Sequence, residues 1–201
     1  MKNIAIFCSG FGSNLQAIIK AVSKGKIKAK IAIVISDKVD AYALVRAKKA
    51  KIPIAFIDPS VYKDKKSYEQ SVVRILEKRN IDFVILAGYM RILSEYFIKR
   101  FKDKILNVHP ALLPSFKGIQ GIKDALTYGV KITGVTVHFV DAKPDHGPII
   151  SQAVVKINPD DTQESLAKRI HALEHKLYPK AIQLLVKGKL KIKKRLVEIK
   201  K

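Results

Sequence analysis

The residues most able to do chemistry lie in segment 107–114, Asn-Val-His-Pro-Ala-Leu-Leu-Pro. Its first residues have the composition of a buried strand, which Pro110 ends because proline has no N–H for the ladder. Side chains alternate along a strand, so Asn107 and His109 are predicted to share a face. An imidazole can transfer a proton near neutral pH, and an amide can hydrogen-bond a developing oxyanion. A lone histidine would favour a structural interpretation, but this pair before a rigid loop favours catalysis.

A second chemical signal is the glycine turn at 9–14, Ser-Gly-Phe-Gly-Ser-Asn, between an apolar strand and an amphipathic helix. Backbone N–H groups and the helix dipole attract an anion there, and Ser13 and Asn14 add side-chain donors, so a phosphate is the expected ligand. Two alternatives stay open. One is a simple strand-to-helix turn. The other is a nicotinamide dinucleotide site with Asp37 on the ribose, which is weaker because Leu15 replaces the third glycine of that fingerprint.

Residues 171–175, His-Ala-Leu-Glu-His, match a short zinc-site pattern with histidines at i and i+4. Five-residue patterns with two free positions also arise by chance, and little chain follows to supply a third ligand. The helix simply needs a polar face opposite its leucines, and His171, Glu174, His175 and Tyr178 would form that face. We therefore expect no metal here.

The elements that would position these residues alternate between strand and helix through the first half of the chain. Strands are expected at 3–8, 29–36, 53–57, 83–87 and 105–109. This alternation predicts an α/β fold with a doubly wound, mostly parallel sheet. In the C-terminal half, alternating apolar residues predict a strand over 132–140, and a further strand over 149–157 is expected to be antiparallel to it.

Helices are expected to connect these strands, over 15–22, 41–51, from Ser67 onward, and from Ser94 to Phe101. A capping box at Asp161 and Glu164 should open a long helix, which Pro179 would kink or end. The basic tail, residues 187–201, shows a weak strand at Leu190 and Ile192 and is otherwise expected to be solvated.

Length and composition predict a single domain over 1–201, because 201 residues with 48% hydrophobic content can bury a sizeable core. One cysteine, Cys8, excludes an internal disulfide framework and favours a cytoplasmic location. No apolar run is long enough to cross a membrane. We therefore expect no membrane partner.

The net charge of +22, from 39 Lys and Arg against 17 Asp and Glu, has three interpretations. In order of weight they are a lysine-rich surface of the hyperthermophile kind, attraction of small anionic substrates, and binding of nucleic acid. The lysines are scattered and aromatic residues are sparse among them, so no specific nucleic acid is expected.

Six stretches, in the same order along the chain, resemble the folate-dependent phosphoribosylglycinamide formyltransferases. They are Ser9-Gly-x-Gly-Ser-Asn-Leu-Gln-Ala-Ile18, Leu86-Ala-Gly-Tyr-Met-Arg-Ile-Leu93, Asn107-Val-His-Pro-Ala-Leu-Leu-Pro114, Thr133-Gly-Val-Thr-Val-His-Phe-Val140, Asp145-x-Gly-Pro-Ile-Ile150 and Glu174-His-x-x-Tyr-Pro179. The resemblance implies a Rossmann-like formyltransferase fold. It also implies transfer of a formyl group from the co-substrate 10-formyltetrahydrofolate to the amine of 5'-phosphoribosylglycinamide, in purine biosynthesis. These two small molecules are the expected partners, and a homodimer stays open beside a monomer.

The resemblance also implies roles for single residues. His109 would be the general acid, Asn107 would bind the formyl oxygen, and Asp145 would pair with His109 and favour its protonated form. The phosphorylated substrate would contact Gly12, Ser13, Asn14 and Glu174. The folate site would contain Met90, Arg91, Ile92, Leu93, Asn107, Asp141 and Lys65. No metal is implied.

The sequence departs from the family at a few positions. Gln120 replaces a frequent histidine, and Lys65 stands where an arginine can help bind folate, which weakens that assignment because lysine lacks a planar fork. His138 aligns with a family histidine near the site and is expected to support it. Formylation of methionyl-tRNA and hydrolysis of formyltetrahydrofolate are the nearest alternatives, and both are expected to need a further domain. A basic RNA-binding module without catalysis is the alternative from another class.

Overall fold

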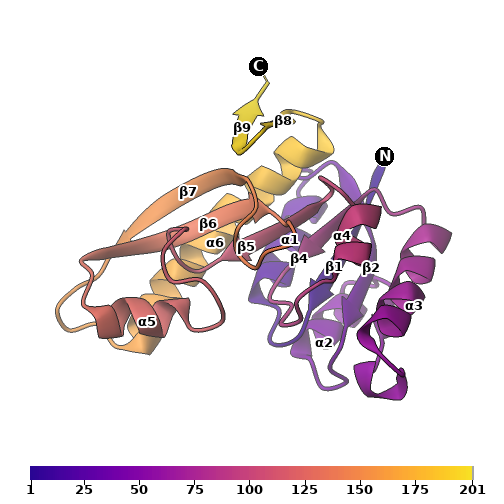
Figure 1. Ribbon diagram of the computed structural model, residues 1–201, viewed down its shortest axis with the longest axis horizontal. Coiled ribbons are helices and arrows are strands. Elements are labelled where there is room, and N and C mark those ends of the chain that lie inside the picture. The colour runs from indigo at the N-terminus through magenta and orange to yellow at the C-terminus, as the bar shows by residue number, and fades with distance from the viewer. Residues whose placement is uncertain (201) are drawn as a thin grey trace.

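A mixed sheet forms the centre of the computed structural model, which describes residues 1–200 (Figure 1). Its strands are β1 (Lys2–Cys8), β2 (Ala29–Ser36), β3 (Ile54–Phe56), β4 (Phe83–Leu86), β5 (Ile105–His109), β6 (Ile132–Phe139), β7 (Ile149–Lys156), β8 (Leu190–Lys193) and β9 (Leu196–Ile199). Within residues 1–200 these nine strands lie in the order β3-β2-β1-β4-β5-β6-β7-β9-β8. The pairs from β3 to β5 are parallel, whereas β5–β6 and β6–β7 are antiparallel. The predicted doubly wound, mostly parallel sheet with an antiparallel C-terminal portion is confirmed.

Helices cover both faces of this sheet. They are α1 (Ser13–Ser23), α2 (Tyr42–Lys49), α3 (Lys65–Lys78), α4 (Glu95–Arg100), α5 (Gly121–Tyr128) and α6 (Gln163–Val186), with a 3₁₀ turn at Pro59–Val61. One apolar cluster joins α1, α2, α5 and α6 to the sheet, and a second joins α3 and α4 to the opposite face. Alternation along β1 supplies both clusters, since Ile4 and Ile6 belong to the first and Ala5 and Phe7 to the second.

The topology creates a crevice beside β1. After β1 the chain places β2 on one side of that strand and later places β4 on the other. At such a switch point the loops leaving the carboxyl ends diverge, which opens space for a ligand. The glycine turn 9–14 follows β1, and residues 87–93 follow β4. The glycine turn and the segment expected at the folate site therefore both start at this edge.

Two helix starts differ from the prediction. Asp64, not Ser67, caps α3; its carboxylate accepts the Ser67 N–H at 2.7 Å, so Ser67 is the third residue of the helix. Thr162 caps α6 with Ser165 as its capping-box partner, whereas the sequence pattern suggested Asp161 and Glu164. In both cases several side chains that can cap are adjacent, and spacing alone did not distinguish them.

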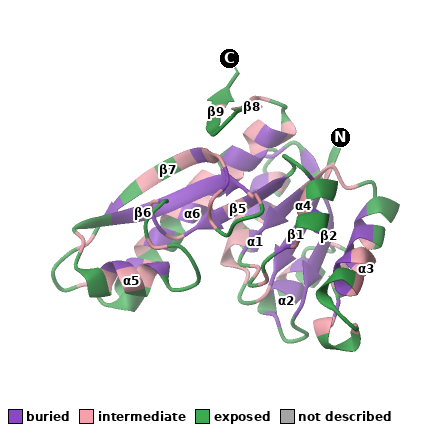
Figure 2. Cartoon of the chain, in the orientation of Figure 1, coloured by how far each residue is buried: buried purple, intermediate pink, exposed green. Residues whose placement is uncertain are grey.

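The C-terminal part contains three further differences. Pro179 lies inside α6, which continues to Val186, so the proline does not end the helix. Helix α5 was not predicted, since it is short and has no side-chain cap. The predicted strand at Leu190 and Ile192 is confirmed as β8, but it pairs with the unpredicted β9, and this hairpin extends the sheet beyond β7, although much of it is exposed (Figure 2). Within residues 1–200, no helix combines the length and apolar character needed to cross a bilayer.

Candidate active site

A cavity of about 260 Å³ lies at the carboxyl ends of β4 and β5. Asn107 and His109 reach it from β5, His138 from β6, and Asp145 from the loop 141–148 between β6 and β7. The antiparallel register pairs Asn107 with His138, which brings those two side chains together. The structure therefore gathers in one cavity the amide, imidazole and carboxylate that the sequence separates by up to 38 positions.

His109 is held between a carbonyl and a carboxylate. Its side chain is 4% exposed. Its Nε2–H donates to the Phe116 carbonyl oxygen at 2.8 Å, because a carbonyl can only accept. Its Nδ1 lies 3.5 Å from Asp145 Oδ2. This geometry fixes the ring and points its second nitrogen at a negative charge, so a proton added at Nδ1 gives an imidazolium beside an ionised partner.

Asp145 is kept ionised by its surroundings. Burial alone would raise the pKa of this carboxyl, but the His138 ring, the Gly118 N–H at 2.9 Å and the charge of His109 lower it to about 2. His138 Nε2 lies 3.7 Å from Asp145 Oδ1. A carboxylate with such a low pKa cannot act as a proton donor near neutral pH. Its part is to orient a neighbouring imidazole and balance its charge.

Asn107 is oriented by His138. The His138 Nδ1–H donates to the Phe139 carbonyl oxygen at 2.7 Å, and in the neutral ring Nε2 then accepts from the Asn107 amide Nδ2 at 3.3 Å, whereas in the protonated ring Nε2–H faces Asp145. One of the two amide hydrogens is therefore engaged, and the other stays available to a ligand. The amide can donate to an oxyanion formed in the cavity. His138 itself positions this donor.

The wall of the cavity is largely apolar. Met90, Arg91, Ile92 and Leu93 line it after β4, and Asp141 lines it from the loop 141–148. Met90 and Ile92 are 64% and 63% exposed, which is unusual for side chains of this kind and leaves apolar surface free for a flat ring. Lys65 does not line this cavity; it lies in the first turn of α3. The structure thus separates Lys65 from the other residues expected at the folate site.

The glycine turn leads directly into α1. Gly12 has a φ of +73°, and a Cβ there would lie 2.8 Å from Ala43, so this turn requires glycine. Asn14 Nδ2 donates to Glu174 Oε2 at 2.8 Å. Glu174 is 3% exposed and also accepts from His171 Nδ1 at 3.0 Å, a bond that raises the pKa of His171. Residues 12–14 and Glu174, predicted to bind one substrate, therefore lie together.

Ser9 connects the two loops at the switch point. Its Oγ donates to Asp37 Oδ1 at 2.6 Å and accepts the Met90 N–H at 2.9 Å, while its own N–H donates to the Gly88 carbonyl at 2.8 Å. Asp37 is 6% exposed and engaged by this serine, which leaves it poorly placed for a ribose. Sequence reasoning treated Ser9 as a turn residue and missed this connecting role, which no spacing rule would reveal.

Two buried polar residues make contacts that were also missed: Thr136 holds the loop after β5, and Tyr178 holds β4 and β5. Thr136 Oγ1 donates to the Ala111 carbonyl at 2.7 Å and accepts the Leu113 N–H at 3.0 Å. The Tyr178 hydroxyl lies 2.8 Å from the Leu86 carbonyl and 2.9 Å from the Leu106 carbonyl. Tyr178 and Glu174 are buried, so the predicted polar, solvated face of α6 is wrong at these positions. Tyr178 bonds to β4 and β5, whereas Glu174 bonds to Asn14 at the start of α1.

The histidine pair on α6 does not converge on a common point. His171 contacts Glu174, whereas His175 lines a separate groove between α1 and α6. Within residues 1–200, no three His, Cys, Asp or Glu side chains gather as a metal site would require. Burial raises the pKa of Cys8 to about 12, so this thiol stays protonated and is a packing residue.

Comparison with known proteins bears on the same segments. A sequence model described as Formyl transferase matches residues 2–182. A Bacillus subtilis (strain 168) protein named phosphoribosylglycinamide formyltransferase is 40% identical over 186 residues, which are 92% of this chain and 95% of that protein. A Haemophilus influenzae protein of the same name is 43% identical over 193 residues, covering 96% of this chain and 91% of its own length.

Solved structures agree with these matches. The crystal structure of glycinamide ribonucleotide transformylase 1 from Symbiobacterium toebii is similar with a TM-score of 0.98 and 43% sequence identity. The similarity covers 100% of this chain and 95% of that one. Each of these matches is long enough to include both the residues that line the cavity and the glycine turn.

Proposed function

This chain belongs to the formyl transferase family, and from that premise we propose that it formylates 5'-phosphoribosylglycinamide with 10-formyltetrahydrofolate. The products are the formylglycinamide ribonucleotide and tetrahydrofolate, and the reaction belongs to purine biosynthesis. The observation that carries the proposal is the grouping of Asn107, His109 and Asp145 around one cavity. An amide donor, an imidazole and an ionised carboxylate are what formyl transfer needs.

The chemistry proceeds in two stages. The substrate amine attacks the formyl carbon, and the carbonyl electron pair moves onto the oxygen. The free Asn107 N–H donates to that oxyanion, and the positive charge of protonated His109, which lines the same cavity, stabilises it. The tetrahedral intermediate then collapses: the bond from carbon to the folate nitrogen breaks, that nitrogen gains a proton, and the former amine loses one. His109 is the proton donor, and Asp145 balances its charge.

The remaining site residues bind the two substrates. In this proposal Gly12, Ser13 and Asn14 hold the phosphate at the start of α1, which is supported by the helix dipole and free backbone N–H groups. Glu174 contacts the glycinamide part, and its buried position beside Asn14 supports that role. The folate ring lies against residues 90–93 and Asp141, which line the cavity.

Some parts of the proposal concern the whole protein. Residues 1–201 form one formyltransferase domain, and a cytoplasmic location agrees with a single, buried cysteine. The transfer needs no metal, because the amine is itself the nucleophile and the residues supply the acid. A homodimer is the assembly to test by sedimentation.

The test is a turnover assay with and without the amine. We expect deformylated folate to accumulate only when 5'-phosphoribosylglycinamide and 10-formyltetrahydrofolate are both present. Replacing Asn107 with Ala should lower kcat by about 10²–10³-fold, as for loss of an oxyanion donor. The exposed Asn158→Ala variant is the matched control and should keep wild-type turnover. Equal folate turnover without the amine would instead identify a hydrolase, and no turnover with both substrates would refute the proposal.

A further inference from the structure

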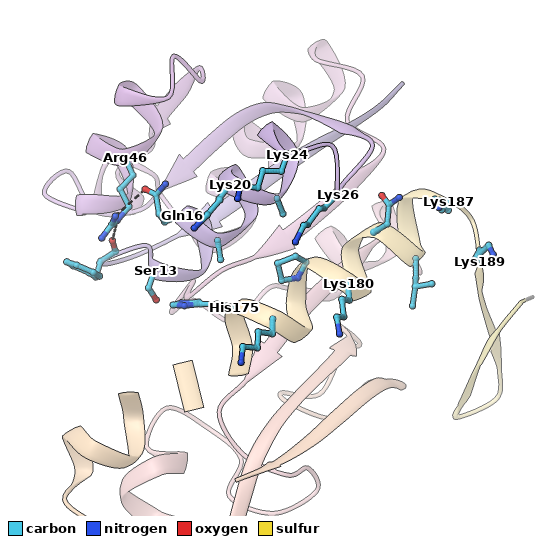
Figure 3. A pocket seen from close by; sticks show the side chains of 17 residues that line it. Ser13, Gln16, Lys20, Lys24, Lys26, Arg46, His175, Lys180, Lys187 and Lys189 are labelled. Atoms are coloured by element: carbon cyan, nitrogen blue, oxygen red, sulfur yellow. Dashed lines mark hydrogen bonds between the residues drawn. The ribbon is translucent and has the colours of Figure 1, made fainter. Parts of the chain in front are cut away.

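A groove separate from the catalytic cavity runs between α1 and α6, with a volume of about 1140 Å³ (Figure 3). Seven lysines and one arginine line it, and its lining contains no aspartate or glutamate. Lys20, Lys24 and Lys26 come from α1 and the turn after it, whereas Lys180 and Lys187 come from α6 and its end. Two elements far apart in sequence thus supply one sign of charge to one concave surface.

The groove lysines are free to meet a ligand. Among residues 1–200, the lysines in ion pairs are Lys2, Lys99 and Lys193, and none of these lines the groove. Lys24, Lys26 and Lys187 are exposed. Unpaired like charges facing one another across a groove repel and lower stability, and a bound anion removes that repulsion.

One end of the groove reaches the start of α1. Ser13 and His175 lie at that end, while Lys187 and Lys189 lie at the other (Figure 3). Ser13 belongs to the turn expected to hold the substrate phosphate. The His175 Nε2 atom is buried and, within residues 1–200, has no hydrogen-bond partner. The basic surface is therefore continuous with the phosphate turn and includes an unsatisfied ring nitrogen beside it.

The lining favours a small phosphate ester over a nucleic acid. Bases bind proteins by stacking on aromatic side chains. Phe11 is the single aromatic residue among those that line the groove; it is 67% exposed, and its ring contacts the Arg46 guanidinium at 4.4 Å and stacks on Tyr42. Arg46 is in turn fixed by hydrogen bonds to the Phe11 carbonyl and Gln16. One aromatic ring offers little stacking surface beside seven ammonium groups, which bind phosphate without reading a base.

We propose that this groove is an outer capture site for phosphate monoesters, which concentrates the phosphorylated amine and passes it to the turn at residues 12–14. The inference rests on the proposed function and adds an entry path to it. A concave surface of one charge sign focuses the electric field and raises encounter rates about 10- to 10³-fold at low salt. The effect is screened once the Debye length falls from about 30 Å at 0.01 M to about 3 Å at 1 M.

The test compares two triple variants of equal net charge. Lys24→Gln, Lys26→Gln and Lys187→Gln remove charge from the groove. Lys78→Gln, Lys102→Gln and Lys104→Gln remove the same charge from exposed sites on and near α3 and α4. Steady-state kinetics of each are measured against 5'-phosphoribosylglycinamide at low and high ionic strength. The positive charge of the groove favours both the encounter with the phosphorylated amine and the binding of its phosphate. The value of kcat/KM therefore reports this charge whether encounter or a later step limits the rate.

We expect the groove variant to lose about threefold to tenfold in kcat/KM for the phosphorylated amine at low ionic strength. Its kcat and its KM for the folate should stay at wild-type values, and the loss should vanish near 0.5 M salt. Equal losses in both variants, or none in the groove variant, would overturn the proposal. So would weaker binding of a short single-stranded RNA by the groove variant with unchanged kcat/KM, which would assign the surface to nucleic acid. A wild-type protein that does not turn over would refute the proposed function instead.

Discussion

Asp145 joins the chemistry of the site to the stability of the fold. Its backbone φ of +46° places the carboxylate between the Gly118 N–H and the rings of His109 and His138. That left-handed conformation is uncommon for a residue other than glycine, although aspartate tolerates it better than most. Of the neighbours that lower its pKa to about 2, His109 is also the proton donor of the proposed reaction, and His138 orients Asn107.

The lowered pKa makes part of the stability depend on pH. An aspartate with a folded-state pKa of about 2, against an ordinary 3.8, stabilises the fold while it is ionised. That contribution is present above about pH 4 and is lost as pH falls toward 2, and it amounts to about 2 kcal/mol. The free energies of unfolding of wild type and Asp145→Asn, measured in urea, should therefore differ near pH 5 and converge near pH 2.

The control for this measurement neutralises a carboxylate on the surface. Asp40 is exposed and makes no ion pair within residues 1–200, so Asp40→Asn should follow wild type at every pH. If the free energies of unfolding of wild type and Asp145→Asn differ by the same amount from pH 5 to pH 2, Asp145 acts through its shape rather than its charge.

Among the elements, the C-terminal hairpin β8–β9 directly contacts the loop 141–148 between β6 and β7. In the turn of this hairpin, Arg195 Nη2 donates to the His146 carbonyl at 2.7 Å, and Nη1 lies 3.2 Å from His146 Nε2. His146 Nδ1 lies 2.7 Å from Asp141 Oδ2. The hairpin therefore holds the loop that carries both Asp141 and Asp145.

Removing this contact should loosen the loop and leave the core intact. We expect Arg195→Ala to raise the KM for 10-formyltetrahydrofolate several-fold with a small change in the unfolding midpoint, because the guanidinium is exposed and contributes little to global stability. Lys191→Ala, on the same hairpin, is the matched control. Equal KM values in both variants would show that the hairpin does not position the loop.

Helix α6 supports the site from beneath through Tyr178. Its hydroxyl donates to the carbonyl oxygens of Leu86, the last residue of β4, and of Leu106, near the start of β5. Tyr178→Phe leaves these buried acceptors without that donor and should lower the free energy of unfolding by about 1–3 kcal/mol. Tyr128 is 80% exposed, so Tyr128→Phe should be neutral in the same urea titration. A neutral Tyr178→Phe variant would mean that water replaces the hydroxyl.

For the whole molecule, sequence patterns predicted the buried strands of the sheet well and the C-terminal hairpin poorly. Buried parallel strands such as β2 and β4 are continuous apolar runs bounded by turn residues, so their positions can be derived from composition. Strand β8 alternates lysine with isolated apolar residues, and β9 is a four-residue segment between lysine-rich runs, so both resemble a solvated tail until pairing with β7 is known. Tertiary contact, not local pattern, creates that strand pair.

The same distinction holds within the site. Asn107 and His109 share one strand face, so their joint orientation follows from alternation. The closeness of Asp145 depends on a loop that returns from β6, and the resemblance to formyltransferases, not spacing, suggested it. Glu174 and Tyr178 look like a polar helix face in sequence, but α6 packs on the sheet, where Glu174 finds Asn14 of α1 and Tyr178 finds the Leu86 carbonyl. Burial of paired polar groups leaves no periodic signal.

The most direct test of the catalytic grouping is a double-mutant cycle on His109 and Asp145 in single-turnover formyl transfer. If Asp145 acts by orienting and balancing His109, then His109→Ala and Asp145→Asn should each lower the rate constant by about 10²–10⁴-fold. The double variant should then be no slower than the slower single variant, because residues that act as a unit are not additive. Multiplied losses in the double variant, or a near-normal rate in either single variant, would contradict the claim that the two residues act together on the formyl group.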